Sequence, residues 1–380
     1  MKTLIHLIIL FFISLLSNAQ ESFIIKDVTI FDGEKVIPKT SILVENGAIS
    51  KIAKSINRNA TVINGNGKFL MPAMTNCHVH AWGIPILQQA VEAGVFNLLD
   101  MHGVEPYQGM MKTYRDSTNY ARFFVAGYAA TAPDGHGTQY GFPVPTLTKP
   151  EDAIKYIADR VKAGVDHIKI IVEPWKPTLS HETVKSIIDE GHKNKKKVVV
   201  HVSKMNDGYQ VLNNNADGLV HIWRDTLMPE DQLQQLVKEK DFFVIPTLLV
   251  SIEVQKKRKN KTAEETAKME VFLKKEVKRL HDAGVPILAG TDPPNVDINY
   301  GTDLYKELIL MSEAGIPNEE VLKGATSLPA DKFKLGKIGY IKEGYIADLL
   351  LLDKNPIEDI THINTMVSMW KAGKKIQTKK

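Results

Sequence analysis

Phe69-Leu-Met-Pro-Ala-Met-Thr-Asn-Cys-His-Val-His80 is an apolar run that ends in two histidines separated by one residue. In an extended strand, side chains two residues apart point to the same face. The imidazoles of His78 and His80 can therefore reach one metal ion. Cys77, the only cysteine of the chain, points to the opposite face and is interpreted as a packed structural residue.

Further potential metal ligands follow along the chain, each at or near the end of a short apolar segment. They are Lys169, His201, His221 and Asp292. Helix-like stretches separate most of these segments, which favours parallel β/α units. In a closed barrel of such units the carboxyl ends of the strands meet at one mouth, so these side chains are expected to converge there.

Eight segments are predicted as the strands of a (β/α)8 TIM-type barrel, the number that such a barrel needs. They are Leu70–His80, Val95–Asp100, Phe123–Ala130, Val165–Val172, Val198–Val202, Gly218–Ile222, Phe243–Thr247 and Pro286–Thr291. Helical patterns between them include Glu151–Ala163, His181–Asn194, Asp231–Lys240 and Glu264–Ala283. The 380 residues suffice for one barrel of about 250 residues and a small second unit.

The two ends of the chain are predicted to form that second unit together. Residues 22–70 contain short strand patterns with Asx-Gly turns, too little core for independent stability. Partner strands are expected at Gly339–Ile341, Ala347–Asp353 and Thr365–Lys371. We therefore predict a discontinuous β-sandwich domain from residues 20–70 and 336–380, beside a barrel of residues 71–335.

Residues 1–19 have the layout of a secretory signal peptide. The apolar core Leu4–Leu16 has 13 residues, which is short for a membrane span. Ser17-Asn18-Ala19 supplies the small residues for cleavage before Gln20; an uncleaved anchor or a buried strand is the alternative. We expect an exported bacterial protein, periplasmic or secreted, with no stable membrane anchor after cleavage, and the single cysteine suits a periplasm.

The order His-x-His, Lys, His, His, Asp resembles the amidohydrolase superfamily over nearly the whole mature chain. The resemblance implies a (β/α)8 barrel that holds two divalent metal ions at its mouth. It assigns His78, His80 and Asp292 to the more buried metal, His201 and His221 to the more exposed metal, and a carboxylated Lys169 to a bridge between them. Histidine and carboxylate donors favour zinc, although manganese, cobalt and iron fit the same donors.

By this resemblance the chain is an enzyme that hydrolyses a carbon–nitrogen bond of an amide or peptide-like small molecule. A metal lowers the pKa of bound water to about 7 and a second metal polarises the carbonyl. Asp292 would act as general base and then as general acid. Lys169 lies between Ile168 and Ile170 and is expected to point opposite to them, towards the barrel axis; a snorkelling lysine or an ion pair with Asp166 is the alternative.

Three residues are candidates for binding the substrate: His136, Tyr140 and Arg224. Gly135-His136-Gly137 resembles a substrate-facing loop of several amidohydrolases. The planar fork of Arg224 suits a carboxylate, although an ion pair with Asp225 fits equally. Further pocket candidates are Glu173 and Trp175, and His102 is interpreted as a loop histidine.

The lysine-containing pattern and the Gly-His-Gly loop look like the branch of dipeptidase and imidazolonepropionase-like enzymes. One alternative is a mononuclear deaminase or a cyclic amide or lactone hydrolase of the same superfamily. Such deaminases carry His-x-x-Glu near the fifth strand, where this chain has His201-Val-Ser-Lys204. A non-catalytic binding protein on the same scaffold is the other alternative, but relatives of that kind usually lose metal ligands.

The charge pattern favours a small-molecule substrate over nucleic acid. The net charge is +4, from 48 basic and 44 acidic residues, and much of the excess lies in Lys256–Lys261 and the C-terminal tail. No aromatic residues interleave with these cations, so a solvated helix face is the better interpretation. The sequence is compatible with a homo-oligomer.

Overall fold

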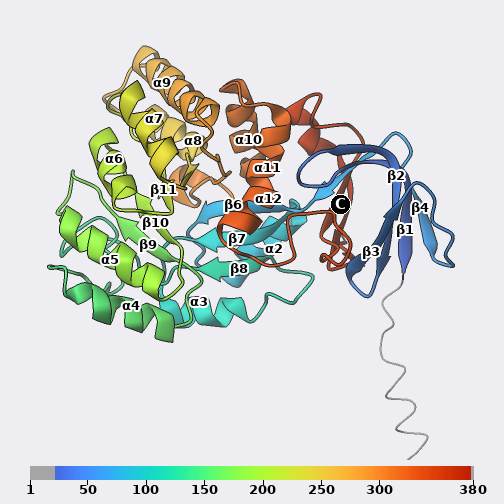
Figure 1. Cartoon of the computed structure of the whole chain (residues 1–380), viewed down its shortest axis with the longest axis horizontal. Helices are drawn as coiled ribbons and strands as arrows, with labels where there is room; N and C mark the ends of the chain where they lie inside the picture. The colour runs from blue at the N-terminus through green and yellow to red at the C-terminus, as the bar shows by residue number, and fades with distance from the viewer. Residues whose placement is uncertain (1–21, 378–380) are drawn as a thin grey trace, which may run out of the picture.

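The protein is a mixed α/β molecule with one mixed sheet and two parallel sheets (Figure 1), which confirms the predicted class. Its computed structural model describes residues 22–377. The predicted signal peptide, residues 1–19, lies outside the described residues. Within the described range, no helix is long and apolar enough to cross a membrane.

The mixed sheet joins the two ends of the described chain. Its eight strands are β1 (Phe23–Phe31), β2 (Val36–Glu45), β3 (Ala48–Ala53), β4 (Thr61–Asn64), β5 (Phe69–Pro72), β13 (Leu349–Leu352), β14 (Met366–Lys371) and β15 (Lys374–Lys375). They follow the order β15-β14-β13-β5-β1-β2-β3, and β4 pairs with β1. Figure 1 shows β1 to β4 at one end of the molecule, beside the C-terminus. The predicted partnership of the two ends is present, but Gly339–Ile341 is not a strand.

Strand β13 binds this sheet to the rest of the protein through the alternation of its side chains. Leu349 and Leu351 pack with Trp370 in an apolar cluster of the mixed sheet. Leu350 and Leu352 point the other way, into the main core of the α/β part. Because successive strand residues alternate between faces, one four-residue leucine strand contributes to both cores.

The α/β part contains two parallel sheets. One has the order β6-β7-β8 and the other the order β12-β11-β10-β9. Their strands are β6 (Met74–Val79), β7 (Val95–Asp100), β8 (Arg122–Val125), β9 (Ile168–Ile171), β10 (Val198–His201), β11 (Gly218–Val220) and β12 (Phe243–Ile245). Two isolated parallel bridges add to this pairing. One pairs Ala130, after β8, with Ile170 of β9, and the other pairs Val244 of β12 with Ile287.

Helices surround these strands (Figure 1). They are α2 (Ile84–Glu92), α3 (Glu105–Lys112), α4 (Asp152–Lys162), α5 (His181–Lys193), α6 (Met205–Asn213), α7 (Glu230–Glu239), α8 (Leu248–Lys257), α9 (Ala263–Asp282), α10 (Asp303–Glu313), α11 (Asn318–Ala325) and α12 (Ser327–Lys332), with short 3-10 turns η1 (Asn295–Asp297) and η2 (Ile360–Thr365). The four helices expected from periodicity agree with α4, α5, α7 and α9 to within one residue at each end. A capping box between Thr262 and Glu265 begins α9.

Several predicted barrel strands differ from the structure. Strand β8 ends at Val125 and not at Ala130, and β9 begins at Ile168 and not at Val165. The segment Leu70–His80 is not one strand, because the chain changes sheets at Ala73. The Ala73 N–H donates to the Asp348 carbonyl and the Met74 N–H to the Gly94 carbonyl, each at 3.0 Å. The segment Pro286–Thr291 forms only the single bridge at Ile287, although the Cys77 N–H also donates to the Ala289 carbonyl at 2.9 Å.

An ion pair between Arg122 and Asp348 crosses from β8 to the segment that leads into β13. The Arg122 side chain is 11% exposed and the Asp348 side chain 3% exposed. A second guanidinium nitrogen lies 3.3 Å from Asp348 Oδ1, and the same oxygen accepts the Ala372 N–H at 2.8 Å. The carboxylate thus links the α/β part to both C-terminal strands.

We expect the substitution Asp348→Ala to lower the free energy of unfolding by about 3–5 kcal/mol, because it leaves a nearly buried arginine without its partner. Denaturant unfolding monitored by circular dichroism measures this loss. The matched control is Glu264→Ala, which removes an exposed pair with Lys268 on α9 and should cost about 0.5 kcal/mol or less. Equal losses in the two variants would contradict the role of Asp348.

Candidate functional site

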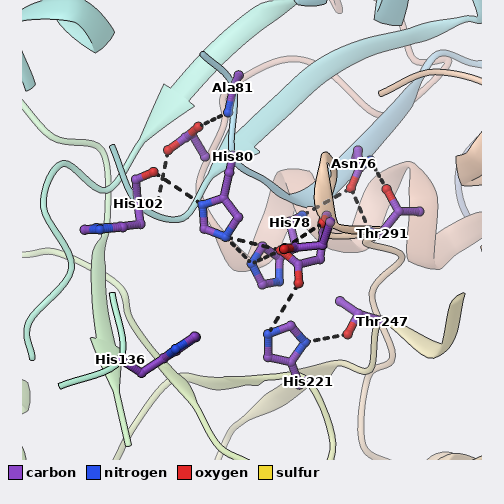
Figure 2. A network of polar contacts seen from close by, with 12 residues as sticks. Asn76, His78, His80, Ala81, His102, His136, His221, Thr247 and Thr291 are labelled. Atoms are coloured by element: carbon purple, nitrogen blue, oxygen red, sulfur yellow. Dashed lines mark hydrogen bonds and ion pairs between the residues drawn. The ribbon is translucent and has the colours of Figure 1, made fainter. Parts of the chain in front are cut away.

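His78, His80 and Asp292 meet at the carboxyl end of β6; Figure 2 shows the rings of His78 and His80 side by side there. The Asp292 Oδ1 atom lies 3.3 Å from His78 Nε2 and 3.2 Å from His80 Nε2. The two Nε2 atoms are 3.3 Å apart. The Asp292 N–H donates to the His78 carbonyl at 2.8 Å, so the backbone holds the carboxylate against the histidine pair.

His78, His221 and Asp292 form a tight group of potential metal ligands, the donor group. One ligand atom each from His78, His221 and Asp292 lies within 4.8 Å of the others. The His221 Nε2 atom is 3.9 Å from Asp292 Oδ2. Its Nδ1 lies 2.6 Å from the Thr247 hydroxyl, a contact that fixes the ring with Nε2 towards the group.

The polar atoms of this group fit a divalent cation. Among the described residues, His78 Nδ1 and Asp292 Oδ1 are buried without a hydrogen-bond partner, which is costly for a carboxylate. Burial holds the pKa values of His78 and His221 well below the ordinary histidine range, so both imidazoles are neutral. Neutral imidazole nitrogen and carboxylate oxygen are ligands that zinc takes.

Lys169 reaches the same cavity from β9, as alternation along the strand predicted. Its side chain is buried, and burial lowers the pKa of its amine to about 7, against the opposing charges of Asp292 and Asp100. The alternative partner Asp166 is engaged elsewhere, 2.6 Å from Arg115 and 3.2 Å from Lys112. The structure therefore places Lys169 among the predicted ligands.

His201 lines the cavity with one of its nitrogens already engaged. Its Nε2 is 2.9 Å from Glu173 Oε2, and the Ser203 hydroxyl donates to the other oxygen of Glu173. Glu173 is 2% exposed. Nδ1 is thus the His201 nitrogen that is left for a further ligand, a detail that the sequence did not reveal.

Three residues around the site have left-handed backbone conformations. The φ angles of His221, Thr247 and Asp292 are 67°, 48° and 62°. Each such conformation costs about 1–3 kcal/mol for a residue other than glycine and is typical of functional sites. His221 directly follows β11, Thr247 lies two residues after β12, and Asp292 directly follows the segment Pro286–Thr291.

His102 binds backbone groups of neighbouring loops and is not part of the donor group. Its Nδ1 accepts the Ala129 N–H at 2.9 Å, and its Nε2 lies 3.1 Å from the Gly137 carbonyl and donates to it. Burial lowers the pKa of His102 to about 3. With both nitrogens engaged, the ring fits the interpretation of a loop histidine.

The predicted substrate residues His136, Tyr140 and Arg224 all line one cavity of about 230 Å³ together with the donor group. The His136 and His201 rings are 5.2 Å apart. In the described part of the chain, the Arg224 side chain makes no hydrogen bond and no ion pair, whereas its backbone N–H donates to the Ser203 carbonyl at 3.2 Å. The alternative with Asp225 is therefore wrong; that carboxylate accepts the Met205 N–H at 3.0 Å.

The sequence did not predict several residues of this cavity, among them Arg258 and Asn295. Arg258 belongs to the basic run Lys256–Lys261, which was interpreted as a solvated helix face. Arg258 directly follows α8, is exposed and lines the cavity. No acidic residue at helical spacing marks it in the sequence as a cavity residue. Asn295 follows the Pro293-Pro294 turn, and its place depends on that loop conformation.

Comparison with known proteins identifies a family for the part of the chain that carries these residues. The sequence profile described as "Amidohydrolase family" matches residues 69–378. The chain is 21% identical over 372 residues to the ochratoxinase of Aspergillus niger, covering 80% of this chain and 75% of that protein. It is 23% identical over 391 residues to the 5-methylthioadenosine/S-adenosylhomocysteine deaminase of Thermococcus onnurineus, covering 91% and 89%.

A solved structure described as a Xaa-Pro dipeptidase with bound methionine has a similar fold. The two structures superpose with a TM-score of 0.79 at 21% sequence identity, covering 94% of this chain and all of the other. At that identity the likeness extends to the fold alone.

We expect the substitution Asp292→Asn to weaken binding of the tightest zinc ion by at least about 100-fold, because it removes the only carboxylate of the three-residue group. Competition titration against a chromophoric chelator measures the affinity. The control is Asp297→Asn on the same loop, whose carboxylate is 93% exposed. Unchanged affinity in Asp292→Asn would contradict the assignment of a cation to this group.

Proposed function

The chain belongs to the amidohydrolase family, and on that premise we propose that it hydrolyses the amide bond of a dipeptide or N-acyl amino acid. The observation that carries the proposal is the convergence of His78, His221 and Asp292 donor atoms within 4.8 Å in a cavity that two arginines also line. The donor group suits activation of water, and the arginines suit a substrate carboxylate.

The names of similar proteins agree with a hydrolase of carbon–nitrogen bonds. A dipeptidase has the same fold, and an ochratoxinase is a relative in sequence. Export, expected from residues 1–19, would place the reaction outside the cytoplasm.

We propose that the two parallel sheets and the segment Pro286–Thr291 form one closed (β/α)8 barrel. Support comes from the links across both gaps: the bridge between Ala130 and Ile170, and the bond of the Asp292 N–H to the His78 carbonyl. The barrel would comprise residues 71–335. The mixed sheet would fold over its own apolar cluster as a β-sandwich domain of residues 20–70 and 336–380.

We propose that two divalent ions, zinc by this donor set, occupy the cavity. The six side chains that would hold them are His78, His80, Lys169, His201, His221 and Asp292. Bound ions would supply Lewis acidity towards the carbonyl and a nucleophilic water at neutral pH. Carboxylation of Lys169 would replace a cation, which is a poor ligand, by a carbamate with oxygen donors.

In this proposal Asp292 moves the proton. Its carboxylate takes the proton of the attacking water and returns it to the leaving nitrogen, first as base and then as acid. The backbone bond to His78 and the left-handed turn at Asp292 keep the carboxylate directed at the cavity. A fixed position of this kind favours proton transfer because little reorganisation is needed.

We propose that His136 donates a hydrogen bond to the substrate carbonyl. The Gly137 N–H donates to Gln139 Oε1 at 2.8 Å, which orients that amide so that its NH2 group donates to His136 Nδ1 at 3.1 Å. Burial lowers the pKa of His136 to about 4, so the ring is neutral at pH 7. Its proton is then on Nε2, which is a donor.

Arg224 and Arg258 are proposed to bind the free carboxylate of the substrate, and Tyr140 to cover it from the loop side. Guanidinium groups pair with carboxylates through two parallel hydrogen bonds. Neither arginine has an ion-pair partner among residues 22–377, so both are available to a ligand.

A substrate panel tests the function. Zinc-loaded protein of residues 20–380 should hydrolyse dipeptides and N-acyl amino acids, and blocking the carboxylate as an amide should lower kcat/KM by about 10–100-fold because a charge-assisted pair is lost. Arg224→Met should abolish this discrimination. Bound metal is counted on the same sample. Activity confined to lactones or cyclic amides, or deamination with one ion per chain, would contradict the proposal.

A substitution tests the proposed role of Lys169 as a metal ligand. We expect Lys169→Ala to retain one ion of two and to lose about 100-fold or more in kcat, because the bridging ligand is absent. Acetate or propionate should restore part of both, since a small carboxylate can occupy the space of the carbamate. Intact-protein mass should show the mass of CO2 on the native chain.

The matched control for this test is Lys176→Ala, a lysine of the loop after the same strand, which contacts the Trp175 ring. It should leave metal content unchanged. Two ions and full activity in Lys169→Ala would show that Lys169 is not a ligand.

A further inference from the structure

We infer that the substrate carries a bulky apolar acyl group, an aromatic ring or a branched chain, which binds in an apolar pocket beside the donor group. This inference rests on the proposed function, because it specifies the substrate class of the same site. The pocket is built by loops that follow β6 and β7, by the segment around Phe142, and by the Pro293-Pro294 turn.

The pocket has a volume of about 350 Å³, at the lower end of the range of about 300–1,000 Å³ for small-molecule sites. Its walls are His80, Trp82, Val104, Tyr140, Phe142, Pro294 and Asn295. Apart from His80, the wall includes no charged or titratable group that ionises near pH 7. One ring with a short linker is the kind of group that this space accommodates.

The apolar pocket adjoins the reaction site and shares three lining residues with it. His80, Tyr140 and Asn295 line both the apolar pocket and the cavity of the donor group. The His80 Nε2 atom lies only 3.2 Å from Asp292 Oδ1. Figure 2 shows the His80 ring between His102 and His78. A group attached to the reacting carbonyl carbon can therefore enter the pocket.

The aromatic walls are partly exposed to solvent and pack against neighbouring rings. Trp82 is 36% exposed and Tyr140 42% exposed. The Phe142 ring packs against Trp82 and against His102, each with centroids 5.4 Å apart, and the hydrogen bonds of His102 hold that ring in place. A preformed apolar surface that remains in water gains free energy when a ligand covers it.

The charges of the main cavity decide which half of the substrate enters the pocket. Arg224 and Arg258 line the main cavity and are absent from the wall of the apolar pocket. They follow β11 and α8, on the side of the four-stranded sheet, whereas Trp82 and Val104 follow strands of the three-stranded sheet. The amino-acid carboxylate therefore binds on the arginine side, and the acyl group binds in the pocket.

Matched substrates test this inference. Wild-type, zinc-loaded protein should favour N-(phenylacetyl)-L-alanine over N-acetyl-L-alanine by at least about tenfold in kcat/KM, the discrimination expected from an apolar pocket. Trp82→Ala and Phe142→Ala should each reduce this ratio, and Val104→Phe, which fills the pocket, should reduce it further. Tyr107→Ala removes a similarly exposed ring of α3 outside the pocket and should leave the ratio unchanged.

Binding provides a readout that does not depend on turnover. Calorimetry with the same holoprotein should show that N-(benzylphosphonyl)-L-alanine binds at least about tenfold more tightly than N-(methylphosphonyl)-L-alanine, and Trp82→Ala should reduce the difference. Tight, selective binding without hydrolysis of any acyl amino acid would support the pocket while the proposed function fails. Hydrolysis with no preference for the apolar acyl group, or equal binding of the two phosphonates, would overturn the inference while the proposed function stands.

Discussion

The placement of the Asp292 carboxylate beside three histidines is the constraint on which the rest of the site depends. The bond of its N–H to the His78 carbonyl joins the last extended segment of the α/β part to its first strand. The same residue adopts a left-handed turn, at φ 62°, that directs the side chain over the strand ends. His221 faces it from the other sheet with a ring fixed by Thr247. Without the four-stranded sheet, His221 would not join His78 and Asp292, so formation of the complete site requires both sheets.

The mixed sheet stabilises this arrangement from a distance. The chain leaves β5 and enters β6 within one residue, so the first strand of the site begins where the mixed sheet ends. Alternation in β13 places leucines in both cores, and Asp348 adds an ion pair to Arg122 on β8. Loss of the C-terminal strands would therefore expose apolar surface on both sides of the junction, although no residue of those strands lines the cavity.

Local patterns in the sequence predicted what depends on short range. The alternation of side chains along a strand predicted that His78 and His80 share a face and that Lys169 points to the cavity. The helical periodicity predicted the bounds of α4, α5, α7 and α9 closely. Contacts between distant segments could not be predicted in this way. The break at Ala73 depends on acceptors at Asp348 and Gly94, and the position of Arg258 depends on where α8 ends over the cavity. The engagement of His201 by Glu173 likewise requires the relative placement of β9 and β10, which no spacing encodes.

Charge balance explains why a lysine can stand among the proposed metal ligands. Two divalent cations would bring four positive charges to a cavity whose donor group has one carboxylate and where burial lowers the pKa values of His78, His201 and His221. A protonated Lys169 would add a further positive charge at short range, which a low-dielectric site disfavours strongly. Burial lowers the pKa of its amine to about 7, so the neutral form that can take up CO2 is accessible. Carboxylation then changes the charge at this position by two units, from cation to anion. In the proposed site, bound metal would therefore stabilise the carboxylated form of Lys169. Carboxylation would strengthen metal binding by the same free energy, as thermodynamic linkage requires.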